Sequence, residues 1–418
     1  MIEVILATDS KGGIGYNGCM PWSVKLETFL FKAKTMGHYL IVGKNTYKTL
    51  PILENRYIVV VTSEKGPNRF ETVERAIEFC AGNKIFIIGG GMIYNYVFTN
   101  LSHLITKVHH SVMNGEYTCD TFVSIPKLPI TSVQDFVDFI HYEYEPKTLG
   151  EIQYTNLLQN VLKTGVDSEG RNGITRSVFG KHLKFDLREG FPLLTTKKMF
   201  LRGIIEELLF FIRGDTNTKM LEEKGVNIWK GNTSREFLDK MGFKYPEGEM
   251  GPMYGYQWRT FNGENIDQLA DVIETIKEDP KSRRILMTTY NPIQVKEGVL
   301  YPCHSIIIQF FVEDGNLDMF CYNRSSDLFL GLPFNIASSS LLQMIIAKMT
   351  NLTPRYFNLS LGDAHIYASH MDAAETQTKR VPYKFPKIEI LKDMPVVFED
   401  FKLTEYASHP IIKAPMVA

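Results

Sequence analysis

The sequence is organised around the stretch Tyr301-Pro302-Cys303-His304-Ser305-Ile306-Ile307-Ile308-Gln309-Phe310-Phe311-Val312, in which a cysteine stands at the start of an apolar run. Further along, the chain reads Asn323-Arg324-Ser325-Ser326-Asp327. If these runs form neighbouring strands, Arg324 comes close to Cys303. A cation beside a cysteine lowers its pKa and makes the thiolate available as a nucleophile. Taken alone, such a cysteine is more often a core residue beside a structural ion pair. The surrounding residues decide between the two interpretations.

The surroundings of Cys303 resemble the motifs of thymidylate synthase. In chain order these motifs are Gly251–Arg259 (GPMYGYQWR), Tyr301–His304 (YPCH), Arg324–Asp327 (RSSD), Phe329–Ala337 (FLGLPFNIA) and Gly362–Tyr367 (GDAHIY). Five separate motifs in the family's order make the resemblance specific. It extends from about Glu151 to the end of the chain and implies an α+β thymidylate synthase domain.

This resemblance implies a role for each matching residue. Cys303 would attack C6 of the uracil ring of dUMP, Glu207 would order water and assist proton transfers, and Tyr254 would lie near the C5 proton. Arginine forks suit phosphate oxygens, and a matched amide contact selects uracil over cytosine. The dUMP-binding set implied by the family is Arg171, Arg283, Arg284, Arg324, Ser325, Asp327, Asn335, His365 and Tyr367. The folate-binding set is Lys197, Trp229, Asp327, Gly331 and Ala418.

The composition is that of an ordinary globular protein. Of the 418 residues, 44% are hydrophobic and 22% are charged, and the net charge is -1. A broad nucleic-acid or membrane surface is therefore not indicated. The five cysteines include no CxxC pair, so we expect neither a disulfide framework nor a metal site. Odd, widely spaced cysteines favour a reducing, cytoplasmic location. No apolar run is long enough to span a membrane, and no secretory leader is recognised.

The first part of the chain alternates short apolar runs with helical segments. Strands are expected over 2–8, 38–42, 57–62 and 85–88, and helices from Ser23, from Gly43, over 73–80 and from Met92. This alternation predicts an α/β sheet covered by helices. The helix that follows Ser23 places Leu26, Phe29, Leu30 and Ala33 on its apolar side. Glu27 lies one residue off that side, where it would face a cleft or simply suit the helix dipole.

Residues 1–145 resemble dihydrofolate reductase. The matching motifs include Met20-Pro21-Trp22, Gly43-Lys44-Asn45-Thr46, Ile88-Gly89-Gly90-Gly91-Met92-Ile93-Tyr94 and Asp120-Thr121-Phe122. Glycines between a strand and a helix let backbone N–H groups approach a phosphate, although such turns also serve packing alone. In this family the Gly89–Gly90 peptide is expected to be cis.

The reductase resemblance also assigns residues to ligands. Glu27 would bind the pterin ring and act in catalysis, Phe31 would pack on it, and Arg56 would hold the folate α-carboxylate, with Thr106 supporting the acid. The NADPH-binding set is Ala7, Ile14, Gly15, Gly43, Lys44, Thr46, Ser63, Gly89, Gly90, Gly91 and Tyr94.

A few positions depart from the two family patterns. Tyr47 replaces a tryptophan, and Met92 replaces a residue that is basic in some reductases, which leaves Lys44 more of the 2′-phosphate. In the synthase part, Lys230 follows Trp229 where aspartate is usual, and Asn323 precedes Arg324 where glutamine is usual. None of these changes removes a group needed for making or breaking bonds.

The sequence therefore predicts a fused enzyme with a reductase-like domain over 1–145, a short linker over 146–150 and a synthase domain over 151–418. The synthase would make dTMP and dihydrofolate from dUMP and 5,10-methylenetetrahydrofolate, and the reductase would reduce that dihydrofolate with NADPH. The resemblance also implies a homodimer formed through the synthase domain. An active synthase with a degenerate, structural reductase half is the alternative. A regulatory RNA-binding role is a second alternative, which the near-neutral charge disfavours.

Overall fold

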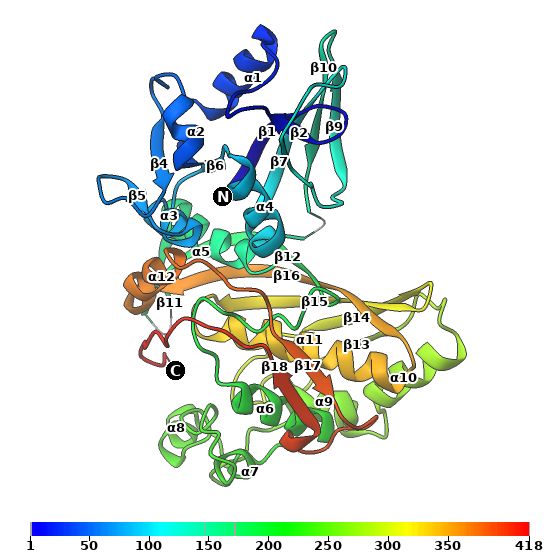
Figure 1. Cartoon of the computed structure of the whole chain (residues 1–418). Coiled ribbons are helices and arrows are strands. Elements are labelled where there is room, and N and C mark those ends of the chain that lie inside the picture. Colours follow the sequence, from blue (N-terminus) through cyan, green and yellow to red (C-terminus); the bar gives the residue numbers. More distant parts are fainter. Residues whose placement is uncertain (1, 147, 171–172, 418) are drawn as a thin grey trace. The chain divides into compact units, whose positions relative to one another are not determined.

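The computed structural model describes residues 2–146, 148–170 and 173–417. It divides into two compact units (Figure 1). The first comprises Met1–Leu149 with Thr378–Val381, and the second comprises Gly150–Gln377 with Pro382–Ala418. Each unit has its own sheet and its own buried apolar clusters.

The first unit is built on an eight-stranded sheet with the order β5-β4-β3-β6-β1-β7-β10-β9. The strands from β5 to β7 are parallel, whereas β10 and β9 are added antiparallel at one edge. The sheet strands are β1 (Ile2–Thr8), β3 (Tyr39–Gly43), β4 (Tyr57–Val61), β5 (Arg69–Phe70), β6 (Ile85–Ile87), β7 (Ile105–Met113), β9 (Ile130–Asp135) and β10 (Phe139–Tyr144). A separate ribbon pairs β2 (Gly13–Gly15) with β8 (Thr121–Phe122).

Helices connect the parallel strands, as the predicted α/β alternation requires. They are α1 (Lys25–Thr35), α2 (Lys44–Thr49), α3 (Val73–Phe79), α4 (Gly91–Asn100) and the 3-10 turn η1 (Ser102–Leu104). The predicted fold class of this unit is confirmed. The Gly89–Gly90 peptide is cis, as expected from the resemblance.

The sequence interpretation of α1 is wrong in two respects, the N-cap residue and the buried face. Val24, not Ser23, is the N-cap residue, and no side chain caps the helix. Leu26 and Phe29, predicted to face the core, are 43% and 63% exposed. Glu27 and Thr35 are the buried residues of this helix. The helix is short and weakly amphipathic. Tertiary packing that buries Glu27 therefore determines the orientation of the helix more than the pattern of its apolar residues does.

The second unit has a six-stranded sheet with the order β11-β12-β16-β15-β14-β13. Its strands are β11 (Val166–Gly170), β12 (Gly173–Asp186), β13 (Leu286–Thr288), β14 (Ile307–Glu313), β15 (Asn316–Asp327) and β16 (Thr353–Tyr367). A small ribbon joins β17 (Lys387–Ile390) to β18 (Phe401–Thr404). Residues 166–170 of β11 pair with residues 173–177 of β12 as a hairpin. Its exposed polar strands lack the alternation that would have identified them.

One face of this sheet is covered by the long helix α11 (Gly331–Met349), which contacts β15 and β16 (Figure 1). Most of α11 is buried, as its nearly continuous apolar sequence predicts. The helix α6 (Leu201–Arg213) packs against it and ends at Gly214, whose φ of 78° is the left-handed conformation that glycine adopts easily. The other helices are α5 (Ile152–Thr164), α7 (Lys219–Glu222), α8 (Arg235–Met241), α9 (Gly255–Arg259), α10 (Gln268–Glu278) and α12 (Met371–Thr378), with 3-10 turns η2 (Phe261–Gly263), η3 (Ala368–His370) and η4 (Phe398–Asp400).

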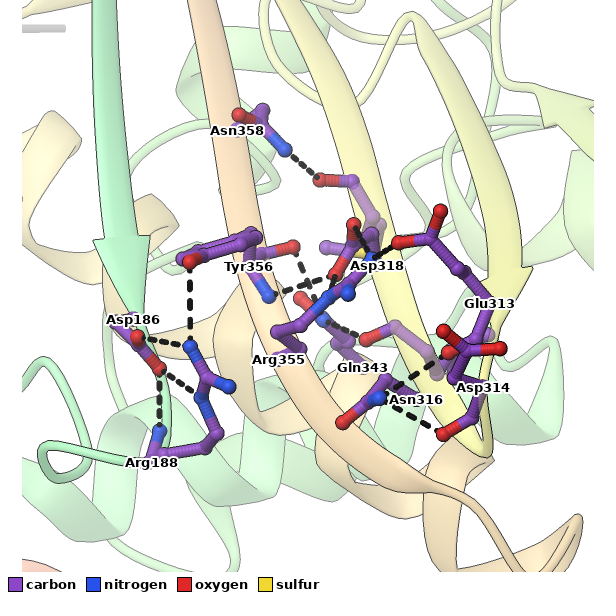
Figure 2. Close-up of polar contacts among 12 residues, drawn as sticks. Asp186, Arg188, Glu313, Asp314, Asn316, Asp318, Gln343, Arg355, Tyr356 and Asn358 are labelled. Atoms are coloured by element: carbon purple, nitrogen blue, oxygen red, sulfur yellow. Dashed lines mark hydrogen bonds and ion pairs between the residues drawn. The ribbon is translucent and has the colours of Figure 1, made fainter. Parts of the chain in front are cut away.

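A polar network stabilises the end of the sheet where β14 turns into β15 (Figure 2). Arg355 donates from Nε and Nη2 to the two carboxylate oxygens of Asp318, both at 2.8 Å, and Nη2 also reaches Glu313 at 2.9 Å. Gln343 of α11 donates to the carbonyls of Leu317 and Tyr356, at 2.8 and 3.2 Å. These contacts connect α11, β15 and β16. They thereby help to position the end of β15 at Asp327 and the start of α11 at Gly331.

No helix within the described ranges 2–146, 148–170 and 173–417 is long and apolar enough to cross a membrane.

Candidate active sites

Cys303 lies in the loop just before β14, next to the hydroxyl of Tyr254. The Tyr254 Oη is 3.5 Å from the Cys303 Sγ and accepts a hydrogen bond from the Cys303 backbone N–H at 3.3 Å. The N–H of Ser325 donates to the Cys303 carbonyl at 3.2 Å, and Arg324 Nε donates to the carbonyl of Pro302 at 3.3 Å. The predicted approach of the Arg324–Ser325 strand to Cys303 is therefore present.

The charge state of Cys303 is determined by competing effects. Burial raises the pKa of the thiol, although part of the residue remains exposed to solvent. The hydrogen bond with Tyr254 and the positive charge of Arg324 act in the opposite direction but do not outweigh burial. Arg324 thus favours the thiolate, as the sequence predicts, while the free site holds the cysteine mainly as the thiol.

Glu207 lies on α6, fully inside the second unit. The indole N–H of Trp229 donates to its Oε1 at 2.7 Å. Burial raises the pKa of Glu207 to about 7, and the Trp229 hydrogen bond only partly opposes this effect. A carboxyl group with this pKa can both accept and donate a proton near neutral pH. Its neighbour Glu206 instead pairs with Lys224 at 2.7 Å, so both acids of this apolar helix have partners.

Aromatic packing holds Tyr254 in place. Tyr254 has a positive φ of 39° and is buried. Its ring stacks on His304 with centroids 4.3 Å apart and packs against Phe211 at 5.0 Å. Burial lowers the pKa of His304 to about 4, so this imidazole is neutral at neutral pH. The neighbouring rings therefore fix the Tyr254 hydroxyl against Cys303 without adding a charge.

Further candidate residues come from the ends of β15, β16 and α11. His365 and Tyr367 lie on β16 with their rings 5.2 Å apart, and His365 Nδ1 is 2.6 Å from Asp363 Oδ1. Asn335 lies near the start of α11 and is partly exposed. The β15–β16 register pairs Ser325 with Asp363 and Asp327 with His365. The candidate side chains thus gather where neighbouring strands end.

Asp327 has a structural role in addition to its predicted ligand role. Its Oδ1 accepts the backbone N–H groups of Phe329 and Leu330, at 3.0 and 3.3 Å, and thereby positions the chain that enters α11. Burial acts to raise the pKa of Asp327. The contact with His370 and the two N–H groups outweigh it, and the pKa is lowered. Gly331 follows at the start of α11.

The remaining residues predicted for the synthase site do not belong to this group. Lys197 is buried, and its ammonium donates to the carbonyl of Phe329 and lies over that ring, so it does not present a surface cation to glutamate tails. Burial lowers its pKa to about 8. Arg283 and Arg284 are exposed in the segment before β13. Arg171 and Ala418 lie outside the described residues.

The two departures in the synthase part have different environments. Lys230 is exposed, and its Nζ lies 3.6 Å from Glu222. Asn323 is fully buried, and its Oδ1 accepts the Ser305 backbone N–H at 3.0 Å. Ser305 has a positive φ of 54°, so this contact supports the turn that follows Cys303. Asn323 therefore positions the cysteine loop through the backbone.

In the first unit, the candidate acid Glu27 is 9% exposed on the inner side of α1. Burial raises its pKa to about 7. Burial and, to a smaller extent, the charge of Glu27 raise the pKa of Tyr94. The Tyr94 hydroxyl donates to the carbonyl of Ile5 at 2.7 Å, so the acid lies near the middle of β1. Phe31, one turn further along α1, packs against the apolar cluster that contains Ile5. A partly protonated acid and an apolar ring thus lie over the same strand.

The glycine turn before α4 permits unusually close backbone packing. A Cβ on Gly90 would lie 2.6 Å from Thr46 Oγ1, and one on Gly91 would lie 2.5 Å from Thr121 Cγ2. The N–H of Gly43 donates to the carbonyl of Gly89 at 2.7 Å. The predicted glycines 43 and 89–91 are therefore brought together with Thr46. A turn without Cβ atoms at the start of a helix fits the pyrophosphate of a dinucleotide.

A charged cluster lies next to α2. Lys44 contacts Glu64 at 2.5 Å, and Arg69 contacts the other oxygen of Glu64 at 2.7 Å. Ser63 is exposed beside them. The sequence analysis missed Arg69, because only the β4–β5 pairing brings it to Lys44. Arg56, predicted for the folate carboxylate, donates to the carbonyl of Glu54 at 3.1 Å and remains partly exposed.

The structure does not bring Thr106 to Glu27. Thr106 donates to the carbonyl of Ile2 at 2.9 Å, three residues along β1 from Ile5. At about 3.3 Å per residue along a strand, Ile2 and Ile5 are about 10 Å apart. The register instead pairs Ala7 with Ser111 on β7. Ser111 is buried and lies 3.1 Å from His141 Nδ1. Ser111, on the same strand as Thr106, is therefore a second candidate for the supporting hydroxyl.

Comparisons with known proteins agree with these two sites. The family described as thymidylate synthase matches residues 152–418, and the family described as dihydrofolate reductase matches residues 1–132. A bifunctional dihydrofolate reductase-thymidylate synthase from Paramecium tetraurelia is 37% identical over 456 residues, covering 99% of this chain and 98% of the relative. Similar enzymes from Zea mays and Leishmania major are 34% and 33% identical, covering 99% of this chain and 96% and 94% of the relatives. The chain therefore belongs to the bifunctional dihydrofolate reductase-thymidylate synthases, which methylate dUMP with methylenetetrahydrofolate and reduce the resulting dihydrofolate with NADPH.

Proposed function

We propose that this chain makes dTMP at a site centred on Cys303 and reduces dihydrofolate at a site centred on Glu27. The observation that carries the proposal is the pair of buried carboxyl groups, Glu207 and Glu27, each with a pKa near 7 in its own unit. Strongly perturbed acids beside apolar and aromatic walls are typical of catalytic sites. A reductase unit kept only for structure gains no support, because it retains both the acid and the close glycine turn.

In the synthase site, Cys303 is the proposed nucleophile. The thiol gives its proton to water, and the sulfur then bonds to C6 of the uracil ring while the C5=C6 double bond opens and its electron pair moves into the C4–O enolate. Tyr254, hydrogen-bonded to the thiol, and Arg324 both favour the thiolate. Glu207 moves protons by way of water, for which a pKa of about 7 is suited. Trp229 holds this carboxyl group in one orientation.

The proposed ligand contacts fall into groups for the phosphate, the pyrimidine ring, the sugar and the folate. Arg171, Arg324 and Ser325 bind the 5′-phosphate, with Arg283 and Arg284 supplied by a second chain. Asn335 bonds to the pyrimidine edge, and His365 and Tyr367 bond to the sugar hydroxyl. Asp327, Gly331 and Trp229 line the folate side, and Ala418 closes it. The position of Ser325, Asp327 and His365 at the ends of paired strands supports this assignment. The burial of Lys197 argues for a structural role for that residue.

In the reductase site, Glu27 is partly protonated at neutral pH and is the proposed proton donor beside the pterin. NADPH, when bound, supplies the hydride. Gly43, Thr46 and Gly89–Gly91 hold its pyrophosphate, and Lys44 and Arg69 face its 2′-phosphate. We assign the role of supporting hydroxyl to Ser111 in place of Thr106.

The proposed assembly is a homodimer through the sheet of the synthase unit. Along β13, β14 and β15, apolar residues alternate between the core and an exposed face, which carries Leu286, Ile307, Phe311 and Phe320. Exposed apolar residues on one sheet face are typical of an interface. A two-fold interface uses the same surface twice, so each chain would give Arg283 and Arg284 to its partner.

Subunit mixing tests the exchange of arginines. A Cys303→Ser chain is mixed with an Arg283→Ala/Arg284→Ala chain, each nearly inactive in dTMP synthesis alone. With random exchange, half of the dimers are mixed and each has one intact site, so roughly a quarter of wild-type activity should return. Failure to recover activity after verified exchange would show that the arginines act within their own chain. Reductase activity is the internal control and should stay constant.

The linker between the domains and the cellular compartment are two further proposals. Residues 146–150 are proposed as the link between the domains, because the family matches end at 132 and resume at 152. A reducing, cytoplasmic compartment is proposed because all five cysteines are free.

The direct test of the synthase assignment is Cys303→Ser beside a Cys19→Ser control. Cys19 is an exposed cysteine of the other unit. The first variant should lose dTMP formation but still bind dUMP, since a serine hydroxyl has no comparable ionised fraction. The control should keep both activities. Substantial synthesis by Cys303→Ser would remove this residue from its proposed role.

A further inference from the structure

Three side chains with metal-binding atoms meet on one face of the reductase sheet. One possible ligand atom from each of His109, His141 and Glu143 lies within 4.8 Å of those of the other two. His109 belongs to β7, and the other two belong to β10. The antiparallel register pairs Glu143 with His109, and His141 with Ser111, so all three side chains project from the same face. None of these three residues has a part in the proposed reduction of dihydrofolate.

Each imidazole is already oriented through its other nitrogen. His109 Nε2 is 2.7 Å from Glu3 Oε2, and His141 Nδ1 is 3.1 Å from Ser111 Oγ. These contacts leave His109 Nδ1 facing Glu143 Oε1 at 3.1 Å. They also leave His141 Nε2 buried without a hydrogen-bond partner. Histidines that ligate metals are usually held in this manner, with the second nitrogen bonded to a carboxylate or another polar group.

We propose that His109 Nδ1, His141 Nε2 and the Glu143 carboxylate bind a divalent transition metal of the zinc class. Two imidazoles and one carboxylate form a donor set that suits Zn²⁺, with a fourth position left for water. Bonds of about 2.0–2.1 Å in a tetrahedral site require donor atoms about 3.4 Å apart, so the present cluster would contract by about 1 Å. The proposal also accounts for the orphaned nitrogen of His141, because a metal would use its lone pair.

Two lysines now supply positive charge to this cluster. Lys34 Nζ is 2.7 Å from Glu143 Oε1, and Lys107 Nζ is 3.3 Å from Glu143 Oε2. Lys34 lies in the last turn of α1, and its side chain is 25% exposed, so its ammonium can move to solvent. The metal and Lys34 would therefore compete for the same carboxylate oxygen. If the cluster binds a metal, removing the Lys34 ammonium should strengthen metal binding. A purely structural ion network would show no such effect.

The sequence could not reveal this cluster. No CxxC or HxxxH spacing is present, because the ligands come from two strands and are joined only by the register of β7 and β10. The expectation that the chain has no metal site was drawn from cysteine spacing alone.

The test is titration of the full chain with Zn²⁺ by calorimetry, and with Co²⁺ by visible absorption. His109→Gln retains an amide for the contact with Glu3, and His141→Asn retains one for the contact with Ser111, but each removes the metal-binding nitrogen. Each should weaken Zn²⁺ binding by at least about 100-fold. The matched control is His110→Gln, on the same strand but with its Nε2 bonded to Thr8 at 2.8 Å, and it should bind like wild type.

A further variant distinguishes loss of metal binding from loss of folding, because it should strengthen binding and not weaken it. Lys34→Met keeps the apolar stem and removes the competing ammonium, so Zn²⁺ should bind more tightly, by roughly two- to fivefold. Wild type should bind one Zn²⁺ per chain, with Co²⁺ giving the intense visible bands of a tetrahedral site. Absence of stoichiometric binding, binding unchanged in the two histidine variants, or no tightening in Lys34→Met would each overturn the proposal.

Discussion

Replacing Glu27 by glutamine should have opposite effects on stability and on catalysis. The carboxyl group is 9% exposed, and burial raises its pKa from the ordinary 4.5 to about 7. This difference corresponds to about 3 kcal/mol favouring the neutral form in the folded unit. Glutamine has nearly the same shape and never ionises, so it removes this dependence on pH. It also removes the proton donor, and reduction of dihydrofolate should fall by about 100-fold or more at neutral pH.

The direction of the stability effect follows from proton linkage. Below pH 4.5 the carboxyl group is protonated in both the folded and the unfolded state, so the stability that its raised pKa contributes is fully present. Between pH 4.5 and about 7 only the unfolded chain ionises, so wild-type stability falls as pH rises. Above about 7 both states are ionised and the loss is complete. The Glu27→Gln variant should therefore equal wild type near pH 4 and exceed it by about 3 kcal/mol near pH 8.

Native-state hydrogen exchange can measure this difference within the reductase unit alone. Protection of the β1 amides, converted to opening free energies after correction for intrinsic rates, is compared between the variant and wild type across pH. Glu78→Gln, which removes an exposed carboxyl group of the same unit, is the control and should show no such trend. A difference that is flat across pH, or near-normal turnover of Glu27→Gln, would refute the assignment of a buried, proton-donating acid.

Three further changes test other parts of the account. Glu207→Gln should abolish the change in dTMP synthesis rate near pH 7 while dUMP binding persists, because its pKa of about 7 lies in that range. A preserved pH profile would assign that step to another group. Asp318→Asn should lower the free energy of unfolding of the synthase unit by about 1.5–3 kcal/mol, since it removes the carboxylate that Arg355 binds twice. Urea unfolding should show this effect, and Asp314→Asn, on the adjacent exposed turn, should be neutral. Asn323→Ala should reduce dTMP synthesis through displacement of the cysteine loop, with reductase activity unchanged; equal synthesis rates would show that the turn holds without it.

Features with a strong local signal were predictable from the sequence. The buried strand β1, the glycine that ends α6 and the apolar helix α11 follow directly from composition and periodicity. The proximity of Cys303 to the Arg324–Ser325 strand also follows, because a short hairpin connects β14 and β15. Local pattern and tertiary structure agree at these positions.

Features that depend on register or on competing packing were not predictable. Thr106 and Ser111 are both hydroxyl residues of β7, and only the pairing with β1 determines which lies opposite Ala7. The apolar pattern of α1 pointed to Leu26 and Phe29, yet the helix buries Glu27. An acid buried in place of apolar residues is a local inconsistency that a functional site can impose.

The central claim is that one chain produces dihydrofolate at Cys303 and consumes it at Glu27. The most direct test follows NADPH absorbance while dUMP and methylenetetrahydrofolate are supplied, with dTMP quantified in parallel. We expect that one NADPH is lost for each dTMP formed. Cys303→Ser should lose this response but still oxidise NADPH with added dihydrofolate, and Glu27→Gln should form dTMP without NADPH loss. Formation of dTMP by wild type without NADPH consumption, even when dihydrofolate is added, would contradict the claim.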